Sequence, residues 1–137
     1  MLPLILHLIG DYVLQTEQMA LRKGNSWFWA SFHALVYALP FLLIANTWAA
    51  WLIIFLPHLI VDRLRLANKF CRLKSYWWFG DRPEIDPCTG FSAGMPVHAH
   101  FWLTIIVDNT MHLSLNYIAL EFLNTPHAGC FLMSSIF

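Results

Sequence analysis

Residues 26–63, SWFWASFHALVYALPFLLIANTWAAWLIIFLPHLIVDR, give the clearest indication of the fold class. No Asp, Glu, Lys or Arg precedes Asp62 in it, and Asn46–Thr47 is its clearest turn signal. A helix needs about 20 mainly apolar residues to cross a bilayer. The stretch therefore predicts an antiparallel pair of membrane helices, at about 26–45 and 48–70, with a very short connection between them.

The whole chain has the composition of a membrane protein. Of its 137 residues, 58% are hydrophobic and 12% are charged, against about 45–50% and 25% in ordinary soluble proteins. Two further apolar segments lie at about 2–22 and 98–123. We therefore expect an all-α, polytopic membrane protein with four transmembrane helices in a bundle, forming one membrane domain over 1–137. The net charge is zero, and the absence of a basic block argues against a nucleic-acid partner.

The cations predict how the helices are oriented. With four spans, all eight Lys and Arg residues fall on one side, which the positive-inside rule makes cytoplasmic. Both termini are then expected on the outer side. The long segment at about 72–97 is rich in Pro, Gly and aromatic residues, so we expect it to lie in the cytoplasmic interface. The expected partners are the lipid bilayer and either a second copy of the chain or another membrane protein.

Ionisable side chains recur inside the apolar segments with helical spacing. Each Asp within them has a His four residues away, which places both on one face of a helix. Ionisable residues at membrane depth are costly and mark candidate functional sites. The three pairs are His7/Asp11, His58/Asp62 and Asp108/His112.

The depths of these residues agree with one another. At about 1.5 Å of rise per residue, all three pairs lie about 10–22 Å from the cytoplasmic interface. His33, on the remaining helix, lies about 10 Å deep by the same measure. All four helices therefore place an ionisable group in one slab of the bundle, which favours a single shared site.

Imidazole together with carboxylate predicts a divalent metal site, with zinc first and manganese, iron and nickel as alternatives. Two other interpretations stay open: a structural polar core that cross-links the helices, and a path for protons or cations. The predicted metal ligands are His7, Asp11, His58, Asp62, Asp108 and His112.

One motif resembles a known family. The residues that carry the resemblance are HLIGDYVLQT at 7–16, Lys23 after it, HLIVDR at 58–63, and Asp108 with its partner His112. In these residues the chain resembles small bacterial and phage membrane proteins grouped as domain of unknown function 3307. The resemblance covers about residues 4–116, with Asn109 standing where the family pattern has Gln. It implies a bacterial inner-membrane location and supplies no activity. The HxxxD pairs are also similar to those of YdjM-like membrane-bound metal-dependent hydrolases.

These observations favour a metal-dependent hydrolase that acts on a membrane-embedded substrate, such as a lipid phosphate, reached from the cytoplasmic leaflet. Metal-activated water would be the nucleophile, and a spare Asp or His33 the general base. The alternatives are a transporter or channel for protons or divalent metals, and a non-catalytic phage or bacterial membrane factor that is partner-binding, holin-like or an exclusion protein. The predicted catalytic residues are Asp11, Asp62, Asp108 and His33.

Overall fold

The computed structural model describes residues 1–78, 84–86, 90–92 and 94–124, and all the named elements in these ranges are helices. The prediction of an all-α chain is confirmed. In chain order the elements are α1 (Leu2–Leu8), the π-helix η1 (Ile9–Val13), α2 (Glu17–Arg22), α3 (Trp27–Ala38), the 3₁₀ helix η2 (Leu39–Leu43), α4 (Trp48–Arg63), α5 (Leu66–Trp78) and α6 (Val97–Phe122).

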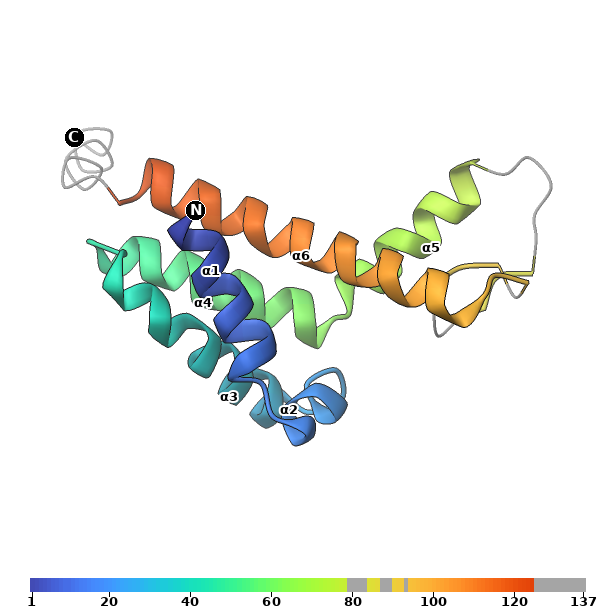
Figure 1. Ribbon diagram of the computed structural model, residues 1–137, viewed down its shortest axis with the longest axis horizontal. Coiled ribbons are helices and arrows are strands. Elements are labelled where there is room, and N and C mark those ends of the chain that lie inside the picture. The colour runs from blue at the N-terminus through green and yellow to red at the C-terminus, as the bar shows by residue number, and fades with distance from the viewer. Residues whose placement is uncertain (79–83, 87–89, 93, 125–137) are drawn as a thin grey trace, which may run out of the picture.

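The long helix α6 forms one side of the molecule, and α4 packs along it (Figure 1). Helix α3 packs on the other side of α4, so α4 lies between α3 and α6. Helix α1 contacts α6, and η1 contacts α3. Helix α5 diverges from the bundle at the end opposite to Met1 and the end of α6 (Figure 1).

The first predicted helix is interrupted. We expected one helix over about 2–22, but α1 passes into a π-helical turn, and residues 14–16 separate that turn from α2. The amide N–H of Leu14 donates to the carbonyl of Ile9 at 2.9 Å, an i→i+5 bond that widens the turn. Helix α2 then begins at a new N-cap, because the Thr16 hydroxyl accepts from the Met19 amide.

The third predicted helix was also too long. It was expected to reach about residue 70, but α4 ends at Arg63. Arg65 has a left-handed backbone conformation, with φ at 50°, which breaks the helical path and redirects the chain into α5. Part of the predicted interfacial loop, 72–97, is therefore helical up to Trp78. Residues 79–83, 87–89 and 93 of that loop lie outside the described residues.

Three of the four predicted helices are therefore interrupted or shorter, whereas α6, Val97–Phe122, matches the predicted helix at about 98–123. In the part of the chain that the structure describes, no helix has both the length and the apolar character needed to cross a membrane.

The hairpin turn at Asn46–Thr47 is tied to the end of α6. Thr47 caps α4 by accepting from the Ala50 amide at 3.1 Å, and its hydroxyl donates to the Leu123 carbonyl at 2.6 Å. The Asn124 side chain donates to the Ile44 carbonyl at 2.8 Å. These bonds fix the ends of α4 and α6 beside each other and so set the relative heights of their side chains.

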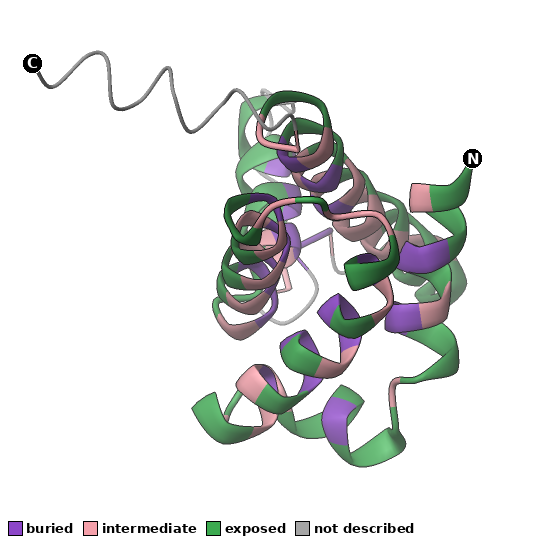
Figure 2. Cartoon of the chain, turned by 90° about the vertical axis from the view of Figure 1, so that its left-hand side faces the viewer, coloured by how far each residue is buried: buried purple, intermediate pink, exposed green. Residues whose placement is uncertain are grey.

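Alanines line the places where the helices meet. Ala30, Ala34, Ala38, Ala50 and Ala119 are each fully buried, and their small side chains let the backbones approach closely. Figure 2 shows buried residues on the faces turned toward neighbouring helices and exposed residues on the outer faces. Close approach of the helices brings the polar side chains of α3, α4 and α6 together in the interior.

Candidate metal centre

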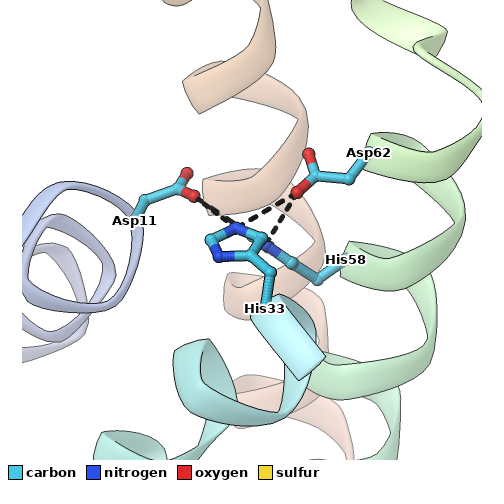
Figure 3. Close-up of side chains that lie close together, drawn as sticks. All are labelled: Asp11, His33, His58 and Asp62. Atoms are coloured by element: carbon cyan, nitrogen blue, oxygen red, sulfur yellow. Dashed lines mark hydrogen bonds and ion pairs between the residues drawn. The ribbon is translucent and has the colours of Figure 1, made fainter. Parts of the chain in front are cut away.

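Four buried side chains from three elements converge in the middle of the bundle (Figure 3). Asp11 comes from η1, His33 from α3, and His58 and Asp62 from successive turns of α4. None of the four is more than 6% exposed. Each offers one ligand atom, and these atoms lie within 4.8 Å of one another.

Their spacing resembles the corners of a tetrahedron. The Nε2 atom of His33 lies 3.1 Å from Oδ1 of Asp11 and 3.2 Å from Oδ2 of Asp62, and Nε2 of His58 lies 3.1 Å from that of His33. Two further edges join Nε2 of His58 to Oδ2 of Asp62 at 3.3 Å and to Oδ1 of Asp11 at 3.8 Å. Tetrahedral ligands at about 2.0–2.2 Å from an ion are about 3.3–3.6 Å apart, so the four atoms suit such an ion.

The Nε2 atom of His33 is too crowded for hydrogen bonding alone. Besides its three neighbours in the cluster, Nζ of Lys23 lies 3.3 Å away. One imidazole nitrogen carries either one proton or one lone pair, so it can satisfy only one of these four neighbours. A cation among them would be shared by all the ligand atoms.

A second group adjoins the first. Asp11, Asp108 and His112 also have ligand atoms within 4.8 Å of one another. Nε2 of His112 lies 3.3 Å from Oδ1 of Asp62 and 3.6 Å from Oδ1 of Asp108. Asp62 therefore directs one oxygen toward each group. The side chain of Asp108 is 30% exposed, so this group reaches the surface of the bundle.

His7, also a predicted ligand, lies beside the centre and belongs to neither group of ligand atoms. Its Nε2 bonds to Oδ1 of Asn109 at 2.7 Å and lies 3.9 Å from Oδ2 of Asp11. Its Nδ1 bonds to the Tyr37 hydroxyl at 2.9 Å, and that hydroxyl accepts from the Asn116 amide at 2.6 Å. A neutral His7 that donates from Nε2 and accepts at Nδ1 satisfies this network.

Packing, rather than outer hydrogen bonds, holds three of the imidazole rings. The Nδ1 atoms of His33, His58 and His112 are buried without a hydrogen-bond partner among the described residues. The ring of His58 instead stacks on Tyr37, with centroids 3.6 Å apart, and its centroid lies 4.1 Å from that of His112. These ring contacts orient Nε2 of His58 and His112 toward the carboxylates.

Lys23 also belongs to the cluster, although the sequence predicted for it only a place on the cytoplasmic side and in the motif that resembles the family. Its ammonium lies 2.8 Å from Oδ2 of Asp62 and 3.9 Å from Oδ1 of Asp11. Burial alone lowers the pKa of this ammonium, but the Asp62 and Asp11 carboxylates outweigh burial and raise it above its ordinary value. The feature that could have indicated a role for Lys23 in the site was its place after the motif that begins at His7.

Tyr37, Asn109 and Asn116 were also missed as parts of the site. Asn116 had a signal, because it continues the i+4 stripe of Asp108 and His112 along one helix face. No local spacing could predict the roles of Tyr37 and Asn109, because their partner His7 lies 30 and 102 residues away in the sequence.

The comparisons with known proteins give a family but no activity. No curated protein and no solved structure matches the chain. A family model described as "Protein of unknown function (DUF3307)" matches residues 1–130. Because this match covers nearly the whole chain, the protein belongs to that family.

Proposed function

We propose that the protein binds one divalent metal ion between Asp11, His33, His58 and Asp62. The observation that carries the proposal is the tetrahedral spacing of their four ligand atoms, which are 3.1–3.8 Å apart along five of the six edges. Two imidazole nitrogens and two carboxylate oxygens suit zinc best, with manganese, iron and nickel as alternatives. His33 therefore joins the ligand set, while His7 holds neighbouring groups in place.

The function that we infer for this ion is hydrolysis. An ion with four protein ligands has no free position, so a water molecule must replace one ligand or expand the coordination to five. Asp11 is the carboxylate that we expect to yield, because it lies 3.8 Å from Nε2 of His58, farther than Asp62 at 3.3 Å. Asp108, which is partly exposed, would then accept the proton of the metal-activated water.

We also propose that the protein lies in a membrane, oriented with both termini outside. Support comes from its inverted distribution of polarity: the ionisable groups are inside, and large apolar side chains are exposed on the outer helix faces. Six examples are Ile5, Leu8, Leu52, Leu56, Ile60 and Ile106. The substrate would then be a lipid phosphate or another membrane-embedded ester.

Cysteine labelling tests the orientation. In a background without the native cysteines, Lys74→Cys on α5 should resist an impermeant thiol reagent added to intact cells and react after permeabilisation. Labelling from outside in intact cells would overturn the orientation.

Metal analysis tests the ion. Full-length protein purified in detergent should contain about one zinc per chain, and chelator should lower its melting temperature. His33→Gln should lose the zinc. His98→Gln, which removes an exposed imidazole at the beginning of α6, should keep it. Wild-type protein that carries no metal and melts identically in chelator would overturn the proposal.

One observation favours a second candidate, a non-catalytic polar core that holds the helices together. Lys23 already supplies a cation 2.8 Å from Asp62, so the cluster has an internal counter-ion. In that case the site would bind no metal, and the protein would act through its surface as a membrane factor.

A further inference from the structure

A cavity of about 250 Å³ lies directly against the metal centre. Its lining includes Asp62 of the cluster and Asp108 of the adjoining group, together with Lys23, Gly24 and Arg65. A volume of this size is below that of pockets for drug-sized ligands, which begin near about 300 Å³. It suits a small group, or the reacting end of a larger molecule.

The charge of the cavity depends on whether the ion is bound. Its described lining has two cations, Lys23 and Arg65, and two carboxylates, Asp62 and Asp108. With the Asp11 carboxylate, which lies 3.9 Å from Lys23, these charges sum to −1 without the ion and to +1 with a divalent ion bound to Asp11 and Asp62. The carboxylates repel an anion from the metal-free cavity, whereas the ion-loaded cavity attracts it.

A divalent ion bound in the cluster would also displace Lys23. In the cluster the Lys23 ammonium approaches three of the four ligand atoms, at 2.8, 3.3 and 3.9 Å. An ammonium and a divalent ion cannot share these positions, because two cations so close together in a buried site repel strongly. Since Lys23 lines the cavity, the cavity is the space into which its displaced ammonium can move.

Arg65 is held in place at the same cavity. Its Nη2 donates to Oδ1 of Asn25 at 3.0 Å. Its side chain lies over Gly24, where an added Cβ would come within 2.3 Å of Nε. The neighbouring Arg63 is engaged elsewhere, donating to the Gly24 carbonyl and lying over the Trp27 ring. Arg65 is therefore the arginine available to a ligand in the cavity.

From these observations we infer that the cavity is a phosphate subsite, in which Arg65 and the displaced Lys23 bind the phosphoryl group of the substrate beside the metal ion. A phosphoryl group matches both the charge and the planar donor pattern of a guanidinium. This inference rests on the proposed function, because the cavity attracts an anion only when the ion is bound. Metal and phosphate must then strengthen each other's binding equally.

Calorimetric titration of the full-length protein in detergent with inorganic phosphate tests the subsite. Free zinc is first removed by gel filtration, and phosphate is then added to the zinc-loaded and metal-free forms. We expect phosphate to bind the zinc-loaded form at least tenfold more tightly. Arg65→Gln should weaken that binding about tenfold, the loss expected for a charge-assisted hydrogen bond, without changing the zinc content.

The matched control is Lys69→Gln, which removes an exposed cation of α5 and should change phosphate affinity less than twofold. Arg65→Lys, which keeps the charge, serves if Arg65→Gln does not fold, and should weaken binding by a smaller factor. Equal affinity of the Arg65 and Lys69 variants, or equal affinity with and without zinc, would overturn the subsite. A wild-type protein without zinc would instead overturn the proposed function.

A competition experiment distinguishes the source of the phosphoryl group. Nanodiscs containing phosphatidic acid should displace inorganic phosphate from the zinc-loaded protein if the group belongs to a lipid. Nanodiscs containing only phosphatidylcholine are the control. If only soluble phosphate esters displace it, the subsite serves a soluble phosphate.

Discussion

The phenol ring of Tyr37 lies face to face with the imidazole of His58, with ring centroids 3.6 Å apart and planes inclined by 16°. Tyr37 also belongs to the apolar core that includes Phe41, Ile54 and Ala119. Its hydroxyl bonds to His7 and to Asn116 on opposite sides. One side chain thus joins the hydrophobic core to the proposed metal ligand His58 through its ring and to the outer polar network through its oxygen.

Removing only that oxygen should separate the two roles. Tyr37→Phe keeps the stacked ring but leaves Nδ1 of His7 and the Asn116 amide without their partner. Each buried unpaired group costs about 1–3 kcal/mol, so the free energy of unfolding should fall, whereas zinc content should stay near one per chain. Denaturant unfolding beside metal analysis measures both. Tyr117→Phe, at a residue that is 63% exposed, is the control. Loss of zinc at unchanged stability would show that the hydroxyl serves the metal instead.

Lys23→Met should lower the stability of the metal-free protein but raise its affinity for zinc. Without metal, Asp62 loses its closest cation, and breaking a buried ion pair costs about 3–5 kcal/mol. With zinc, the variant no longer has an ammonium competing for the same oxygen. Two like charges 4 Å apart repel by about 4 kcal/mol at an effective dielectric constant of 20, so zinc affinity should rise at least tenfold.

Competition titration with a zinc-binding dye measures that affinity, and Lys69→Met is the control. Weaker zinc binding by Lys23→Met would mean that the lysine supports the ion. A variant that is destabilised and binds no zinc, like a zinc-free wild type, would favour the polar-core interpretation.

Asp62→Asn should remove the metal, because a neutral amide does not supply the charge that offsets a divalent ion. The Asp62 carboxylate faces four side chains of the cluster and its surroundings, His33, His58, His112 and Lys23. Its loss should also lower the melting temperature. If the pairs are only interhelical contacts, the change should be small, since such contacts average about 0.6 kcal/mol. Metal stoichiometry and melting with and without chelator distinguish these outcomes.

The apolar segments predicted most of the helical residues, and helical spacing predicted which polar side chains share a face. Each His and Asp of a pair lies four residues apart, and the structure places all three pairs with ring nitrogen and carboxylate 3.3–3.9 Å apart. These are local relationships, set by one turn of one helix. The convergence of Asp11 with His33 was expected only from similar depths.

Contacts that depend on irregular backbone could not be predicted from helical spacing in the sequence. The π-helical turn around Asp11 alters the helical register, and the left-handed Arg65 ends α4 early. Both irregularities shape the site: the first turns Asp11 toward His33, and the second places Arg65 at the cavity. The approach of Lys23 to Asp62 spans 39 residues, so no local pattern could reveal it.

The close contact of η1 with α3 at Gly10 gives the last prediction. An added Cβ on Gly10 would lie 2.7 Å from Cδ2, 2.9 Å from the backbone oxygen and 3.1 Å from Cα of Tyr37. Two of these atoms are backbone, so η1 itself must move away from α3. That movement withdraws Asp11, one residue further along, from its position 3.1 Å from His33.

Gly10→Ala should therefore lower zinc affinity and stability together, although it changes no polar group. The clash should cost about 1–3 kcal/mol, as other overpacked interiors do. Gly94→Ala is the matched control, since a Cβ there meets nothing within 4 Å, and it should leave zinc binding and melting unchanged. Melting temperature and dye competition measure both effects. If Gly10→Ala loses stability but keeps full zinc affinity, Asp11 is not a ligand, and the ion is held by His33, His58 and Asp62 alone.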